Sequence, residues 1–206
     1  NAGRFGANEL TTDEAKKMIR AAQAAGVGDI IISGGEPFMR PDMLELLASM
    51  AELGITARIA SNGSLLTRDM LERLRRETRT KSFQISVETL DPDLYAKLHG
   101  TSPKALGVAL DYLRMMREMG FHTTVSVRVT PETLPGMKDL IDRANAEGWA
   151  TVTLHCPLHT GRTEGALPQD ADLFSALEPV LNHFAGLPEK WLVETYIPWA
   201  EYHPVM

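Results

Sequence analysis

One pattern occurs four times along this chain: a helix-like run, a glycine, and an apolar residue that opens a strand-like run. It reads Ala25-Gly26-Val27, Leu53-Gly54-Ile55, Met119-Gly120-Phe121 and Glu147-Gly148-Trp149. A glycine after a helix favours the left-handed cap that ends it, and the next apolar residue enters a strand. Repeats of about 30 residues in this order are typical of parallel strands with helices packed outside them. The pattern therefore predicts an α/β fold.

The repeats give approximate element boundaries. We expect helices over 11–25, 40–53, 67–76, 103–118 and 134–147, and strands over 27–32, 55–60, 82–87, 123–129 and 151–155. Thr11 and Glu14 have the spacing of a capping box. The run Ile30-Ile31-Ile32 predicts a strand buried on both faces, as in a parallel sheet. Five strands are fewer than the eight of a closed barrel, so we expect a partial parallel (βα)6 TIM-like barrel whose first strand precedes Asn1.

The repeat ends after Pro157, where Gly, Pro and Asp become frequent. A further helix is expected over 170–184. The tail 191–206 holds two Trp, two Tyr and two Pro and predicts an extended segment that covers apolar surface. We therefore expect a partial-barrel domain over 1–165 and the start of a C-terminal extension over 166–206. Because the chain starts in a loop-like stretch at Asn1, without an initiator Met, we expect it to be a fragment.

Composition excludes several classes of partner. A formal net charge of −6 gives no general attraction for nucleic acid or anionic membrane. No apolar run approaches the ~20 residues of a membrane-spanning helix, so we expect a cytoplasmic protein whose partners are small molecules or proteins. Cys156 is the only cysteine, which excludes an internal disulfide and an all-cysteine metal site within the chain. His155, Cys156 and His159 match no common ligand spacing, so no metal ligand is predicted.

Polar residues gather where the expected strands end. Ligands of parallel βα folds bind beyond these ends. A carboxylate there can accept an ammonium group, and an arginine can bind a carboxylate through two hydrogen bonds. A carboxylate and an arginine at neighbouring strand ends could together hold a zwitterion with a ribose attached. The strand-end segments are Gly34-Gly35-Glu36-Pro37, Ser61-Asn62-Gly63, Ser86-Val87-Glu88, Arg128-Val129-Thr130 and His155-Cys156-Pro157.

Each segment also has a purely structural alternative. Gly-Gly-Glu-Pro is an ordinary tight turn, and Asn62-Gly63 is a favoured turn whatever the function. Ser86 and Glu88 could form the polar face of a strand. Arg128 could pair with Glu88 or with Glu132.

Four segments of the chain together resemble the radical SAM superfamily over about Asn8 to Arg162. They are Gly34-Gly35-Glu36-Pro37, Ser61-Asn62-Gly63, Ile85-Ser86-Val87-Glu88 and Pro157-Leu158-His159-Thr160-Gly161-Arg162. Glu88 followed by 91–100 resembles the branch with C-terminal SPASM-type auxiliary cluster domains. The resemblance implies a partial (βα)6 barrel and an enzyme that uses S-adenosylmethionine and a [4Fe-4S] cluster. Such an enzyme generates a 5′-deoxyadenosyl radical to modify a peptide or a tetrapyrrole or other cofactor precursor, with an electron-donor protein as a partner.

The resemblance also implies roles for single residues, all in binding the cofactor. The segment 34–37 would bind the amino group of S-adenosylmethionine. Residues 61 and 62 would line the pocket, and residues 86 and 88 would approach the ribose and the methionine carboxylate. Arg128 would bind that carboxylate, and the backbone over 155–157 would flank the adenine. The predicted residues are Gly34, Gly35, Glu36, Pro37, Ser61, Asn62, Ser86, Glu88, Arg128, His155 and Pro157.

The chain departs from the family at one defining motif, the Cys-x3-Cys-x2-Cys loop. Cysteine thiolates hold such a cluster, and this chain has a single cysteine. We expect the loop to precede Asn1 in the intact protein, so that the chain alone is inactive. The alternative is a cluster-free barrel that binds a peptide or partner protein through the aromatic tail. An ordinary TIM-barrel lyase or isomerase is disfavoured, because no strand-end lysine or late Gly-rich phosphate loop is present.

Overall fold

The computed structural model describes residues 9–155, 170–186 and 192–196. It has an α/β fold in which helices alternate with parallel strands. The chain divides into two compact units. The first comprises Asn1–Ile85 and Ala109–Thr123, and the second comprises Ser86–Val108 and Thr124–Met206.

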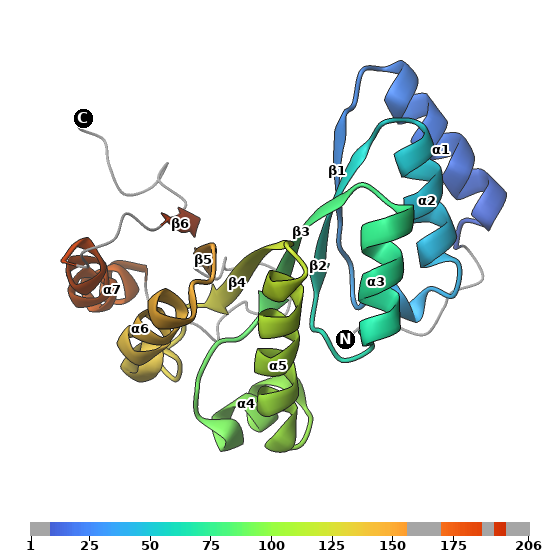
Figure 1. Ribbon diagram of the computed structural model, residues 1–206. Coiled ribbons are helices and arrows are strands. Elements are labelled where there is room, and N and C mark those ends of the chain that lie inside the picture. The colour runs from blue at the N-terminus through green and yellow to red at the C-terminus, as the bar shows by residue number, and fades with distance from the viewer. Residues whose placement is uncertain (1–8, 156–169, 187–191, 197–206) are drawn as a thin grey trace, which may run out of the picture. The chain divides into compact units, whose positions relative to one another are not determined.

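The first unit is built on parallel strands in sequence order, β1 (Asp29–Ile32), β2 (Thr56–Ser61) and β3 (Thr80–Ser86). Helices α1 (Thr12–Ala24), α2 (Met43–Glu52) and α3 (Arg68–Glu77) lie together on one side of these strands (Figure 1). A short 3-10 helix, η1 (Pro37–Met39), follows β1. The core of the unit consists of fully buried apolar side chains, among them Leu47, Met50, Ile59, Leu71 and Phe83.

The second unit contains the parallel strands β4 (His122–Arg128), β5 (Thr151–His155) and β6 (Leu192–Tyr196). Its helices are α4 (Pro92–His99), the start of α5 (Lys104–Glu118), η2 (Leu134–Gly136), α6 (Met137–Glu147) and α7 (Asp170–Ala185). The backbone amide of Val87, directly after β3, donates to the carbonyl of Ser126 at 3.2 Å. This bond pairs the segment that carries Glu88 with β4.

Local signals in the sequence form as expected. Thr11 and Glu14 make both bonds of the capping box, at 3.3 Å from the Glu14 amide and at 2.8 Å from the Thr11 amide. The four glycines of the repeated pattern all adopt positive φ, from 65° at Gly148 to 88° at Gly26. A side chain at these positions would be strained, so glycine is the residue that ends each helix and allows the next strand to begin.

Two elements differ from the expectation. Helix α4 is not predicted, although Asp91 caps it through bonds from Asp93 and Leu94 and Gly100 ends it with a φ of 64°. The tail, predicted only as extended, contains β6, which pairs in parallel with β5. Which strand a segment pairs with depends on tertiary structure. The sequence of the tail therefore indicates an extended backbone but not its pairing with β5.

The prediction that the Ile30 to Ile32 strand is buried on both faces is wrong. The exposed fraction of Ile31 is 65%, while Ile30 and Ile32 are partly buried. Strand β1 lies at the edge of the described sheet and pairs with β2. A run of β-branched residues indicates a strand, but it does not tell a central position from an edge.

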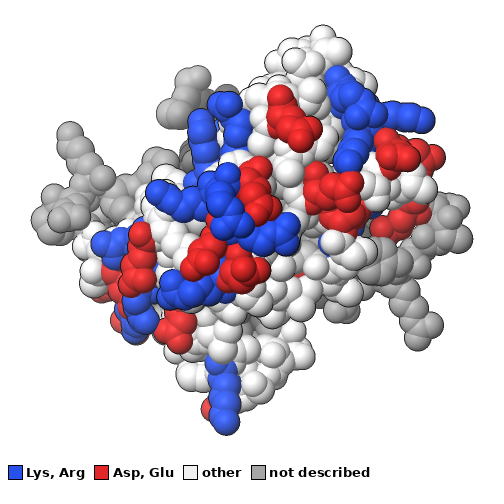
Figure 2. Space-filling model, turned by 45° about the vertical axis from the view of Figure 1, so that its right-hand side comes forward, with Lys and Arg blue, Asp and Glu red and all other residues white. Residues whose placement is uncertain are grey.

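The surface carries charges of both signs. Figure 2 shows Lys and Arg side chains interleaved with Asp and Glu. Exposed ion pairs such as Arg73–Glu77 at 3.2 Å and Arg114–Asp111 at 2.8 Å contribute little to stability. Within the described ranges, no helix combines the length and the apolar character that crossing a membrane requires.

Candidate functional site

A buried carboxylate joins the ends of β1 and β2. Glu36 follows Gly35 and is 8% exposed. Its oxygens accept hydrogen bonds from the Ser61 hydroxyl at 2.9 and 3.0 Å and from the Asn62 amide at 2.9 Å. The amide of Phe38 donates a further bond at 3.2 Å, which caps η1. These bonds fix the Glu36 side chain, and we call the set Glu36, Ser61 and Asn62 the Glu36 cluster.

The turn after β2 places the donors of this cluster. The Ser61 hydroxyl accepts from the Gly63 amide at 3.0 Å, and the Asn62 side chain accepts from the Ser64 amide at 2.8 Å. Gly63 has a φ of 76°, which its missing side chain allows. Side chains that bond backbone two residues further on are typical of Asn and Ser in turns. The turn therefore directs both the Ser61 hydroxyl and the Asn62 amide at Glu36.

The Glu36 cluster can accept a positively charged group. A carboxylate offers about four acceptor positions. Three donor groups contact this one, and the Ser61 hydroxyl shares its single proton between the two oxygens, so three donated protons leave one acceptor position for an ammonium hydrogen. Gly34 and Gly35 are exposed beside it. Gly34 has a φ of 144°, and an added Cβ there would meet no atom within 4 Å. The backbone before Glu36 is thus open to close approach by a ligand.

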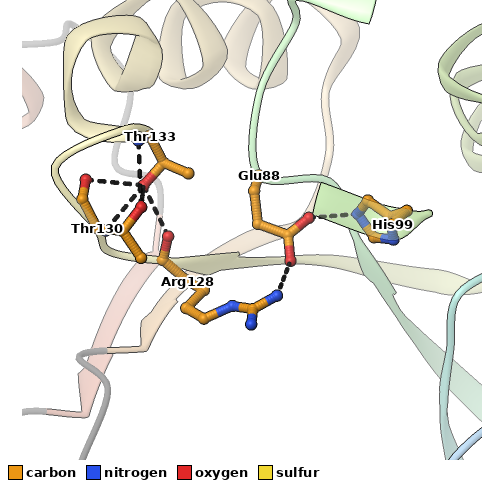
Figure 3. Close-up of polar contacts among 5 residues, drawn as sticks. All are labelled: Glu88, His99, Arg128, Thr130 and Thr133. Atoms are coloured by element: carbon orange, nitrogen blue, oxygen red, sulfur yellow. Dashed lines mark hydrogen bonds and ion pairs between the residues drawn. The ribbon is translucent and has the colours of Figure 1, made fainter. Parts of the chain in front are cut away.

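A second buried carboxylate lies in the second unit (Figure 3). Glu88 is 5% exposed and is held from two directions. The His99 Nε2 lies 2.6 Å from Glu88 Oε2, and the Arg128 Nη2 donates to Glu88 Oε1 at 3.3 Å. Burial raises the pKa of Glu88, but the hydrogen bond and charge of His99, with Arg128, hold that pKa below its ordinary value. Glu88 is therefore charged near neutral pH.

Helix α4 positions His99. The ring of Tyr95, one turn earlier, stacks on the His99 ring with centroids 4.1 Å apart and an interplanar angle of 22°. Tyr95 is buried, and burial, with a smaller contribution from the Glu88 charge, raises the pKa of Tyr95 to about 12. Tyr95 is therefore neutral near neutral pH, and it fixes the ring that contacts Glu88.

The backbone that follows Arg128 is fixed by Thr133 (Figure 3). The buried Thr133 hydroxyl donates to the Arg128 carbonyl at 2.8 Å and accepts from the Thr130 amide at 2.9 Å. The Arg128 side chain is 53% exposed. The backbone of Arg128 is thus held at the end of β4, while its guanidinium is open to a ligand.

The structure brings the predicted residues together in two groups. Gly34 to Pro37 lie with Ser61 and Asn62 in the first unit, and Glu88 lies with Arg128 in the second. Ser86 is partly buried at the end of β3, and the His155 carbonyl accepts from the Val129 amide at 2.9 Å. Pro157 lies outside the described residues. Of the two pairings considered for Arg128, the one with Glu88 is observed. The turn expected at Asn62-Gly63 is present as well.

Sequence reasoning missed His99, Tyr95 and Thr133. His99 stands 11 residues from Glu88, and the two meet because α4 intervenes. The sequence Asp91-Pro92 before an apolar run and Gly100 after it were signals of that helix. Thr130 and Thr133 carry no signal beyond their spacing.

The alternation of helices and parallel strands defines the class of protein, an α/β partial TIM barrel. The family model "Radical SAM superfamily" matches residues 2–144, and the chain belongs to this family. The chain is 29% identical over 156 residues to an "AdoMet-dependent heme synthase" of Methanosarcina barkeri, covering 76% of this chain and 44% of that protein. It is 30% identical over 133 residues to a "PqqA peptide cyclase" of Bradyrhizobium diazoefficiens, covering 65% of this chain and 34% of that protein.

Solved structures agree in fold. Streptococcus suis SuiB bound to precursor peptide SuiA superposes with a TM-score of 0.82 at 23% identity, over 96% of this chain and 44% of that chain. SuiB bound to S-adenosylmethionine superposes with a TM-score of 0.75 at 22% identity, over 94% of this chain and 45% of that chain. The predicted fold and family are confirmed, and nothing in these likenesses supports the cluster-free alternative. The chain spans less than half the length of each of these relatives.

Membership of the family implies S-adenosylmethionine and a [4Fe-4S] cluster as cofactors. The residues present fit the first: an open glycine backbone, a buried carboxylate with acceptor capacity and an exposed guanidinium. They do not fit the second. The sequence has one cysteine, and the described residues contain no group of three or more His, Cys, Asp or Glu able to hold a metal ion.

Proposed function

We propose that this chain is the S-adenosylmethionine-binding core of an enzyme that modifies a peptide or a tetrapyrrole or other cofactor precursor. Membership of the radical SAM superfamily supports the chemistry, and relatives named for haem synthesis and for peptide cyclisation support the two substrate classes. When bound and cleaved by one electron from a reduced cluster, S-adenosylmethionine would supply methionine and the 5′-deoxyadenosyl radical that removes hydrogen from the substrate. The observation that carries the proposal is the Glu36 cluster beside an open glycine backbone.

In this proposal the Glu36 cluster binds the amino group of S-adenosylmethionine. Ser61 and the Asn62 amide hold the carboxylate of Glu36 in place, so its orientation does not have to be established when the ligand binds. Preorganised groups of this kind favour binding because less side-chain freedom is lost. Backbone carbonyls of Gly34 and Gly35 accept the remaining ammonium hydrogens.

The strand ends of the second unit bind the opposite charge and the nucleoside. The Arg128 guanidinium binds the methionine carboxylate, for which its exposed planar fork is suited. Ser86 and Glu88 approach the ribose and the methionine carboxylate of the ligand, and the backbone over 155–157 flanks the adenine. A domain boundary near residue 165, an electron-donor protein as a partner and a cytoplasmic location stay predictions of this proposal.

Anaerobic reconstitution of the full-length protein tests the proposal. With S-adenosylmethionine and a reductant, it is expected to release 5′-deoxyadenosine, and Glu36→Ala is expected to lower that yield and weaken cofactor binding. Glu52→Ala is the matched control, because Glu52 is exposed on α2. A cluster-loaded protein that neither binds S-adenosylmethionine nor releases 5′-deoxyadenosine would overturn the proposal.

A further inference from the structure

We propose that His99 is a positioning residue: it holds the Glu88 carboxylate in place, so that the Arg128 guanidinium remains available to a carboxylate ligand. The inference rests on the proposed function, since the ligand is the carboxylate of S-adenosylmethionine. His99 itself touches no ligand in this arrangement. Its effect on binding passes through Glu88 and then Arg128.

The two contacts of Glu88 are unequal. The contact to His99 is short, at 2.6 Å, and His99 is 16% exposed, whereas Arg128 contacts Glu88 at 3.3 Å and is 53% exposed. A short bond between partly or fully buried groups defines a position better than a long one to an exposed flexible side chain. His99 therefore sets where the carboxylate lies, and Arg128 is the partner that can shift toward a ligand.

His99 is suited to this task because its own position is fixed. Its ring stacks on buried Tyr95, and α4, which carries both, is closed at each end by Asp91 and by Gly100. The Lys97–Glu132 pair, at 2.5 Å, involves exposed side chains and lies apart from these contacts. A histidine can combine the aromatic stacking with a ring nitrogen that reaches Glu88.

Loss of the His99 contact leaves Arg128 as the partner of a buried carboxylate. A buried charge that loses a hydrogen bond is costly, so Glu88 then draws the guanidinium toward itself. The ligand carboxylate must compete with Glu88 for the same donors. Since hydrogen bonds to charged groups contribute roughly 1.5–3 kcal/mol, we expect at least about a tenfold weaker affinity.

Two substitutions separate the bond from the stacking. His99→Phe keeps an aromatic ring against Tyr95 but has no nitrogen for Glu88. His99→Gln loses the ring but places an amide donor near the position of Nε2. Calorimetry on the full-length, cluster-loaded protein would measure affinity for S-adenosylmethionine and for its decarboxylated analogue. His122→Gln, at an exposed histidine of β4, is the control.

The expected result is specific for the carboxylate. His99→Phe should weaken the binding of S-adenosylmethionine by about tenfold and weaken the binding of the decarboxylated analogue, which keeps the ribose near Glu88, by a clearly smaller factor. His99→Gln should restore most of the loss. If His99→Phe does not fold, His99→Asn replaces it, because its shorter amide does not reach the Nε2 position.

The contrary outcomes are distinguishable. Wild-type protein that binds neither compound overturns the proposed function, and this inference falls with it. Wild-type protein that binds S-adenosylmethionine while His99→Phe binds it equally well overturns only the positioning role. An equal loss for both compounds, not restored by His99→Gln, also overturns it, because the histidine would then serve general packing.

Discussion

The Ser61 hydroxyl donates to both carboxylate oxygens of Glu36, at 2.9 and 3.0 Å, across 25 residues of sequence. Both side chains are buried, so neither finds water as a substitute partner. Buried polar groups of this kind depend on each other, and removing one leaves the other with fewer hydrogen-bond partners. The end of β1 and the end of β2 are therefore coupled by a polar contact as well as by the strand pairing.

Ser61→Ala is expected to lower the free energy of unfolding by about 1–3 kcal/mol, because Glu36 would keep only backbone donors. Urea denaturation of the purified protein measures the change. Ser64→Ala, in the same turn but exposed, should stay within about 0.5 kcal/mol of the wild type. Equal stability of the two variants would show that the Ser61 bond contributes nothing beyond the turn.

Gly34→Ala is expected to weaken S-adenosylmethionine binding and to destabilise the fold by about 1–3 kcal/mol, because Gly34 has a φ of 144°. The added methyl would meet no atom of the chain within 4 Å, so the stability cost is one of backbone strain. Isothermal calorimetry and thermal unfolding measure the two effects. Gly28→Ala is the control, since Gly28 has no positive φ and its Cβ also meets nothing. Unchanged binding by Gly34→Ala would contradict close approach of the ligand at this backbone.

What could be predicted from the sequence is what local chemistry determines. The capping box at Thr11 and the glycine at position 148 act within a few residues, and both form as expected. The chemistry of parallel strand ends also selected Glu36 and Arg128 as candidates. These positions follow from the alternation of helices and strands, which needs no knowledge of packing.

What could not be predicted depends on which segments meet in space. Contact between His99 and Glu88 requires α4, and the pairing of β6 with β5 requires the completed sheet. The exposure of Ile31 likewise follows from the place of β1 at the edge of the described sheet. Burial and partnership are tertiary properties, and intrinsic propensity does not encode them.

The lowered pKa of Glu88 predicts a pH dependence of stability. A carboxyl whose pKa is lower in the folded than in the unfolded state stabilises the fold above its unfolded pKa. That contribution is lost as pH falls through the lowered folded pKa. Glu88→Gln should therefore be less stable than the wild type at pH 7, and the difference should shrink as pH falls below the ordinary glutamate value of about 4.3.

Chemical denaturation of wild type and Glu88→Gln between pH 7 and pH 3 measures this difference. Other carboxyls also titrate in this range, so only the difference between the two proteins reports on Glu88. Glu52→Gln, at an exposed position of α2, should follow the wild type at every pH. A difference for Glu88→Gln that is constant with pH would contradict a Glu88 pKa held below its ordinary value by its contacts.

Gly107→Ala is expected to stabilise the protein by about 0.5–1 kcal/mol. Gly107 lies within α5, its φ is not positive, and an added Cβ would meet no atom within 4 Å. Alanine would thus reduce the freedom of the unfolded chain without straining the folded one. The denaturation midpoint should rise, whereas Gly100→Ala, at a φ of 64° after α4, should lower it. A lower midpoint for Gly107→Ala would contradict the helical backbone and the open space at this position.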